Sequence, residues 1–191
     1  MSKPIEDYGL IGNMLSCALV GRDGSIDWLC LPRFDSDACF AALLGTPEHG
    51  RWLIAPNGKT QRTTRRYLPG TAILETTFET ADGTASVTDF MPLGPSEETV
   101  ELIRIVRGVD GRVAMDMELS LRFGYGTTVP WVRRRDYGLR AVSGPDAVDL
   151  VTSVPLVGKD MKTYARFEVE KGRSVPFTLA GSGQRRLVRV E

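Results

Sequence analysis

The residues best suited to chemistry lie close together, between positions 27 and 37. Three carboxylates of this stretch accompany an aromatic ring and a guanidinium: Asp27, Asp35 and Asp37 beside Trp28 and Arg33. Inverting glycoside hydrolysis needs one protonated carboxyl group and one carboxylate about 6.5–9.5 Å apart, and burial usually raises the pKa of the acid. Asp35 and Asp37 are equally well placed to cap a short helix, and Arg33 can pair with either. Helix capping is enough to explain the spacing of these aspartates, so we expect no catalytic residue in this stretch.

A second group of aromatic residues occurs between positions 123 and 132, where the sequence reads Phe-Gly-Tyr-Gly and then Pro-Trp-Val. If exposed, Tyr125 and Trp131 would form a platform for stacking a sugar or a docking patch. If buried, they would form a wide turn between strands or part of an interface, since aromatic residues also favour interfaces. Gly124 and Gly126 do not fit a Gly-x-Gly-x-x-Gly pattern, so we expect no phosphate-binding loop.

The cysteines and the single histidine give little support to nucleophilic or metal chemistry. The thiols are Cys17, Cys30 and Cys39, and His49 is the only histidine. No Cys-x-x-Cys spacing and no nucleophile motif accompanies them, so the sequence predicts no metal site, no cofactor and no Ser-His or Cys-His centre. An odd number of cysteines predicts reduced thiols, which are typical of a cytoplasmic protein.

The composition is that of an ordinary globular chain. The 191 residues are 42% hydrophobic and 25% charged, which argues against disorder. Acidic and basic residues number 24 each, so no net field attracts nucleic acid or an anionic membrane. The N-terminus lacks the pattern of a signal peptide, and no apolar stretch approaches the ~20 residues that cross a bilayer. We expect a cytoplasmic protein without nucleic-acid or membrane partners.

Turn signals dominate the first 57 residues. Asp23-Gly24 separates two apolar segments and predicts a β-hairpin. Cys39–Leu44 is the best helix candidate, because residues 35–37 can cap it and Gly45 can end it. We expect one or two short helices in this N-terminal part.

From Arg51 onward, apolar and polar residues alternate with period two. Pro69-Gly70 and Asp82-Gly83 predict turns on either side of a strand. Turns recur about every 8–12 residues without a long amphipathic helix, which indicates a mostly β fold, an antiparallel β-sandwich. We expect a single domain over residues 1–180 and a tail over 181–191. Further strands are predicted at 84–90, 101–108, 113–123, 139–143, 146–152, 163–171 and 174–179.

The chain resembles the N-terminal domain of bacterial family 15 glycoside hydrolases, which include glucoamylase-like and trehalase-like enzymes. The resemblance covers roughly residues 4 to 180 and includes the Tyr-Gly-Leu-Ile-Gly-Asn that begins at Tyr8. Its other blocks are Asp23–Ser36, Phe40–Gly45, Gly50–Trp52, Arg66–Thr71, Leu74–Thr76 and Val87–Pro92.

This resemblance implies a β-sandwich of super-sandwich type that packs on an (α/α)6 barrel. In the family the barrel carries two catalytic glutamates, an acid and a base, for inverting hydrolysis of α-glucosidic bonds. Nothing in this chain matches the barrel, so the implied role is that of a non-catalytic accessory domain whose partner is a barrel in the same or another polypeptide. The candidates for a sugar-pocket rim or a domain interface are Trp28, Arg33, Phe34, Asp35, Tyr125 and Trp131.

Two other functions remain open. A free-standing carbohydrate-binding module would bind α-glucans or trehalose through Trp28, Trp52 or Trp131. A self-sufficient hydrolase would use the aspartates, which meet the paired-carboxyl requirement poorly. An exposed apolar patch, where the barrel would sit, would also allow homo-oligomers to form.

Overall fold

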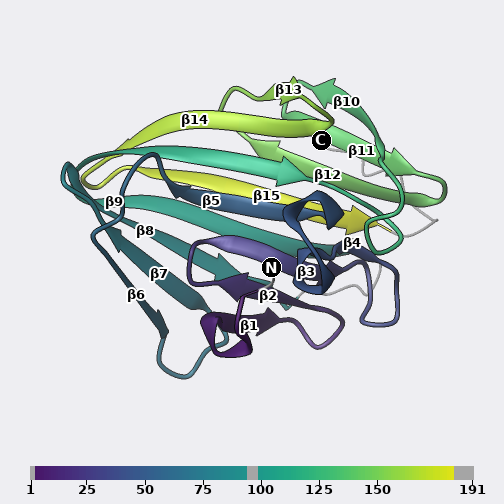
Figure 1. The fold of residues 1–191 in the computed structure, drawn as a ribbon, viewed down its shortest axis with the longest axis horizontal. Helices are drawn as coiled ribbons and strands as arrows, with labels where there is room; N and C mark the ends of the chain where they lie inside the picture. Colours follow the sequence, from purple (N-terminus) through teal and green to yellow (C-terminus); the bar gives the residue numbers. More distant parts are fainter. Residues whose placement is uncertain (1–2, 94–98, 183–191) are drawn as a thin grey trace.

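The protein is a two-layered antiparallel β-sandwich in the computed structural model, which describes residues 3–93 and 99–182 (Figure 1). The first layer has the order β1-β2-β3-β5-β9-β14-β13, with β4 beside β3. The second has the order β6-β7-β8-β9-β15-β12-β11-β10. The strands are β1 (Tyr8–Gly12), β2 (Cys17–Gly21), β3 (Ser25–Cys30), β4 (Ala38–Phe40), β5 (Arg51–Pro56), β6 (Arg62–Tyr67), β7 (Leu74–Glu79), β8 (Gly83–Phe90), β9 (Thr99–Ser120), β10 (Trp131–Arg135), β11 (Gly138–Ser143), β12 (Asp146–Thr152), β13 (Val157–Lys159), β14 (Lys162–Glu170) and β15 (Ser174–Ser182).

Strand β9 belongs to both layers. Its first half pairs with β8 and β15, and its second half pairs with β5 and β14. The strand bends between the two halves, where Gly111 has a φ of 62°, and Figure 1 shows this bend at the left of the view. Any side chain at Gly108 would place a Cβ 2.1 Å from the carbonyl oxygen of Glu170, so only glycine fits there. The bend therefore brings both ends of β9 to the same end of the sandwich.

The alternation of apolar and polar residues predicted from the sequence matches the alternation of buried and more exposed residues in the strands. Met115, Met117, Leu119 and Leu121 share one parity, and all are at most 4% exposed. The hairpin predicted at Asp23-Gly24 joins β2 to β3, where Gly24 donates its N–H to the carbonyl of Gly21 over 2.9 Å. The mostly β fold and its antiparallel sandwich arrangement are confirmed.

The helix predicted over Cys39–Leu44 is not formed. Residues Ala38–Phe40 form β4 against β3, and only Ala42–Leu44 makes a single 3-10 turn, η2. The short helices of the described residues are all 3-10 turns, since Ile5–Asp7 (η1) and Pro47–His49 (η3) are of the same kind. An isolated helix of two turns is marginal in water. The strand that pairs with β3 forms instead, and Cys39 and Phe40 are buried there.

Other expectations need smaller corrections. The strands predicted over 101–108 and 113–123 are one continuous strand, β9, which bends at Gly111 instead of ending there. Strand β15 continues to Ser182, so the first two residues of the tail predicted over 181–191 belong to the second layer, and residues 183–191 lie outside the described residues. No helix among residues 3–93 and 99–182 is long and apolar enough to cross a membrane.

Arg104 joins the two layers across the core. Its side chain is fully buried and pairs with Asp89 on β8 at 2.7 Å. The same guanidinium donates to the carbonyl oxygens of Trp52 and Gly24 in the opposite layer, at 2.8 and 2.7 Å. It also lies 5.1 Å from the centre of the Trp52 ring. The charge of Arg104 is thus paired and hydrogen-bonded inside the core, as burial requires.

Replacing Arg104 with methionine should therefore leave Asp89 buried without its partner. We expect Arg104→Met to lower the free energy of unfolding by about 3–5 kcal/mol, measured by urea denaturation. Arg107 lies three positions along the same strand and is exposed, so Arg107→Met should change that free energy by less than about 0.5 kcal/mol. Equal effects of the two substitutions would show that the buried pair does not stabilise the fold.

Candidate functional site

The loops at one end of the sandwich gather the residues singled out in the sequence. This loop end comprises residues 13–16, 31–37, 41–50 and 121–130, and β4 marks it at the right of Figure 1. Phe34 donates its backbone N–H to the carbonyl of Leu15 at 3.0 Å, and Tyr125 donates to that of Ala38 at 3.2 Å. These bonds hold segments far apart in the sequence in one surface.

Trp28 and Tyr125 are in direct contact at the loop end. Their ring centres lie 6.1 Å apart and the planes are tilted by 40°. Trp28 is half-buried and packs against the small cluster of Cys30, Ala38 and Ala41. Tyr125 is 45% exposed and has a φ of 59° within the turn over 123–128. The predicted turn between strands is present, and it presents one aromatic ring to solvent while the other supports it.

The segment after β3 exposes a charged pair and an apolar ring. Arg33 donates from Nε to the carboxylate of Asp35 at 2.9 Å, on the surface. This hydrogen bond lowers the pKa of Asp35, so the carboxyl group is not held protonated as a general acid would be. Phe34 between them is 57% exposed. The segment therefore offers hydrogen-bonding groups and an apolar contact side by side.

The capping role expected for Asp35 and Asp37 is wrong. The residue at the N-cap of η2 is Ala41, which makes no side-chain capping hydrogen bond. Ser36 instead closes the loop locally, because its Oγ accepts the backbone N–H of Arg33 at 3.2 Å. Burial, with a smaller effect from nearby Asp37, raises the pKa of Asp146.

The contacts of Asp27 indicate a structural role. The residue is 4% exposed, and its carboxylate accepts hydrogen bonds from Lys3 at 2.5 Å, from Tyr8 at 2.7 Å and from Ser25. Burial alone would raise the pKa of Asp27, but the three donors outweigh it and the pKa is lowered. An ionised carboxylate that ties the N-terminal segment to β3 does not form a catalytic acid–base pair with Asp35.

Trp131 occupies a different surface. It lies on β10, the edge strand of the second layer, and is 72% exposed. Its neighbours across a shallow hollow are Arg133, Arg135, Arg140 and Val142. Trp131 makes no ring contact with Trp28 or Tyr125 within the described part of the chain, so the predicted aromatic group is divided between two places.

The cysteines and the histidine have structural roles. The three thiols are unpaired, and burial raises the pKa of Cys30 to about 11, which makes it a poor nucleophile near neutral pH. His49 accepts the backbone N–H of Thr46 at its Nδ1, over 3.1 Å, within η3. No group of three or more histidine, cysteine, aspartate or glutamate side chains that could hold a metal occurs in residues 3–93 and 99–182.

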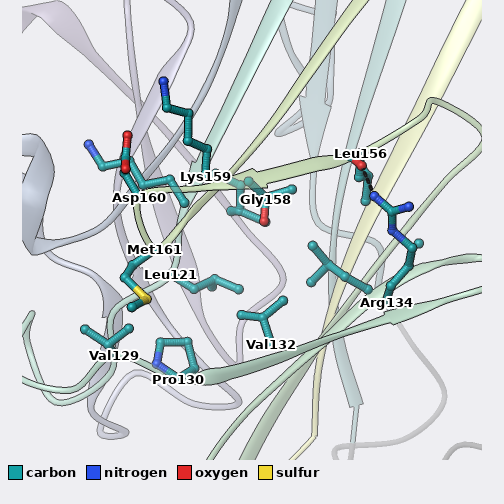
Figure 2. A pocket seen from close by; sticks show the side chains of 15 residues that line it. Leu121, Val129, Pro130, Val132, Arg134, Leu156, Gly158, Lys159, Asp160 and Met161 are labelled. Carbon is teal, nitrogen blue, oxygen red and sulfur yellow. Dashed lines mark hydrogen bonds between the residues drawn. The ribbon is translucent and has the colours of Figure 1, made fainter.

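A groove that was not predicted from the sequence lies beside the loop end. It has a volume of about 610 Å³ and lies between the β10–β11 and β13–β14 hairpins (Figure 2). Val129 and Pro130, which belong to the same loop as Tyr125, form part of its wall. Neither edge strand was predicted, because β10 is a run of arginines and β13 has only three residues.

Comparison with known proteins gives one consistent set of relatives. The family described as "Trehalase-like, N-terminal" matches residues 1–171. The trehalase of Mycolicibacterium smegmatis is 31% identical over 204 residues, a match that covers 94% of this chain and 30% of that protein. Trehalase 1 of Sulfolobus acidocaldarius is 34% identical over 153 residues, a match that covers 79% of this chain and 26% of that protein. The chain thus spans less than a third of the length of these curated relatives.

The ionised state of Asp27 predicts a specific dependence of stability on pH. Because folding lowers its pKa, the carboxylate contributes stability above the unfolded value of about 3.8, and this contribution is lost as the pH falls through the folded value. Asp27→Asn should therefore lower the free energy of unfolding by about 1–3 kcal/mol at neutral pH. Urea denaturation between neutral pH and about pH 3 should show this difference shrinking. A difference that stays constant would show that the charge of Asp27 is not what matters.

Proposed function

The chain belongs to the trehalase-like N-terminal domain family, and from that membership we propose that it is the non-catalytic accessory part of an α-glucosidic glycoside hydrolase. Its partner would be an (α/α)6 catalytic barrel of the glucoamylase and trehalase type, in the same or a separate polypeptide. The observation that carries the proposal is that relatives named trehalase match this chain over less than a third of their own length. The rest of such a protein is then the place for the catalytic glutamates.

The carboxylates of the chain support an accessory role. Inverting hydrolysis needs one carboxyl group held protonated and a second one held ionised across the sugar. Asp27 is enclosed by Lys3, Tyr8 and Ser25, and Asp35 is paired with Arg33, and the pKa of both is lowered. Neither carboxyl group has the raised pKa that a general acid needs.

The loop end is the surface that we assign to the barrel and its sugar pocket. Exposed apolar side chains gather in its loops, and they include Met14 at 87%, Phe34 at 57% and Leu44 at 68% exposure. Leaving such side chains in water is unfavourable, and covering them with a partner removes that cost. Trp28 and Tyr125 would stack on a glucose ring at the pocket rim, and Arg33 with Asp35 would hydrogen-bond its hydroxyl groups. We assign Trp131 to a separate interface on the edge of the second layer.

A free-standing carbohydrate-binding module is the second candidate. The ring pair of Trp28 and Tyr125 favours it, because an aromatic ring that is half exposed and supported from behind can stack on a sugar without a barrel. The proposed ligands are trehalose and α-glucans. For either function we propose a cytoplasmic location, which is supported by three cysteines that remain thiols.

Glucose release tests the accessory role. The purified chain should release no glucose above a buffer blank from trehalose, maltose, isomaltose or soluble starch. The remaining part of the M. smegmatis trehalase, produced separately, should release glucose from trehalose at least roughly tenfold faster when the chain is added, because the chain positions the pocket rim. Phe34→Asp should reduce this stimulation, whereas Val109→Asp, in the bend at the far end of the sandwich, should not. Release by the chain alone would contradict the proposal.

Sugar titration separates the second candidate from the first. An accessory domain without its barrel lacks most of the pocket, so intrinsic tryptophan fluorescence should stay flat up to millimolar trehalose or maltose. A saturable change that Trp28→Ala abolishes and Trp131→Ala preserves would favour the carbohydrate-binding module instead.

A further inference from the structure

The groove between the two hairpins has a volume of about 610 Å³, and the proposed sugar rim does not use it. Figure 2 shows Val129, Pro130 and Met161 at one end of the groove, Leu121 and Val132 in the middle, and Leu156 beside Arg134 at the other end. Leu121 and Leu156 are at most 9% exposed and belong to the core, whereas Met161 is 75% exposed. The groove is therefore a place where the two layers separate and the core is accessible from outside. A mostly apolar concavity of this size is typical of a binding site.

The β10–β11 hairpin, which forms one wall of the groove, has an exposed edge strand. Every residue of β10 is exposed, and its outer edge pairs with no other strand in the described residues. Val132 points its side chain toward the groove and is 47% exposed. Edge strands exposed on both faces gain little from burial, and such apolar patches commonly mark an interaction surface. The exposure of the β10–β11 hairpin is more easily explained if a bound partner lies between it and the β13–β14 hairpin.

The charges around the groove indicate what that occupant is. Arg134 donates only to the carbonyl oxygen of Leu156, and Lys159 makes no hydrogen bond or ion pair among residues 3–93 and 99–182. The groove is also lined by Lys162 and by one carboxylate, Asp160, so cationic side chains outnumber anionic ones in its lining. The chain as a whole is neutral, so this excess of positive charge is local. An occupant with carboxylates beside its apolar side chains would be complementary to this rim.

We propose that this groove binds an amphipathic segment of the catalytic part, with apolar side chains between the hairpins and acidic side chains toward Arg134 and Lys159. This inference rests on the proposed accessory function and specifies the surface that holds the partner. The groove is continuous with the loop end, because residues 123–130 lead from Tyr125 to its wall. Arg122 also donates to the carbonyl oxygen of Met161 at 3.0 Å. One polypeptide can therefore fill the groove and cover the loop end together.

Binding of the partner tests the proposal with two matched variants. The probe is the part of the M. smegmatis trehalase that this chain does not match, titrated with the full 191-residue chain by calorimetry. Val132→Asp places a carboxylate in the groove and should weaken binding by roughly tenfold or more. Val109→Asp adds the same charge at a valine that is 45% exposed in the bend of β9, and it should leave the affinity within about twofold.

A third variant separates charge from packing. Lys159 is exposed and makes no contact that its loss would disturb, so Lys159→Glu should fold normally, as judged by urea denaturation. It should weaken binding, and the difference from the unchanged chain should shrink with added salt because the interaction is between charges. An affinity that none of the groove variants changes would overturn the groove proposal and leave the accessory function standing.

Two remaining outcomes would count against the proposal in different ways. If the unchanged chain does not bind the probe at all, the accessory function fails and the groove proposal fails with it. If the chain self-associates in sedimentation velocity and Val132→Asp abolishes that association, the occupant is a second copy of the chain. Binding that Val132→Asp and Lys159→Glu weaken, and Val109→Asp does not, is the result that supports the proposal.

Discussion

The buried guanidinium of Arg104 is the interaction on which the arrangement of the two layers depends. It is held by Asp89 in its own layer and by the carbonyl oxygens of Gly24 and Trp52 in the other. Apolar packing is not directional and would tolerate some sliding of one sheet over the other. A charge held by three partner residues does not tolerate it, because any slip would leave a buried charge unsatisfied. Arg104 thus fixes the register between β3, β5, β8 and β9, the strands that hold the core together.

The loop end follows from this register and from the bend in β9. A strand shared by both layers brings its two ends to the same end of the sandwich, and the loops that follow β3, β4 and β9 meet there. This is how Trp28 reaches Tyr125, although 97 residues separate them in the chain. The surface that we assign to the catalytic part is therefore a consequence of the topology, with the groove as its lateral extension.

Much of the fold could be predicted from the sequence, because alternation in a half-buried strand is a local signal. The strand predicted over 113–123 has Met115, Met117 and Leu119 on its buried face, and the turn predicted at Asp23-Gly24 joins β2 to β3. Arg104 was missed, since a charged residue among apolar ones usually indicates the solvent face. Arg104 lies two positions from Leu102 and from Val106, which are both buried, and this period-two spacing was the signal in the sequence that Arg104 faces the core. The helix over 39–44 was a local preference that pairing with β3 overrides.

The candidate site could be predicted only in part. Trp28, Phe34 and Tyr125 were chosen for their chemistry, but their grouping depends on contacts between distant segments that spacing does not encode. Trp131 was grouped with Tyr125 by proximity in the sequence, and the structure places it on a different surface. The groove has no sequence signature, because its walls come from two hairpins of different layers.

Hydrogen exchange of the chain with and without the remaining part of the M. smegmatis trehalase tests the central claim most directly. We expect slower amide exchange in the loop end, in residues 31–37 and 123–130 above all, and along the β10–β11 and β13–β14 hairpins. The bend of β9 at residues 108–112 should exchange at an unchanged rate, because it lies at the opposite end. Protection confined to the bend, or no protection at all, would contradict the claim that this domain supports a catalytic partner through its loop end.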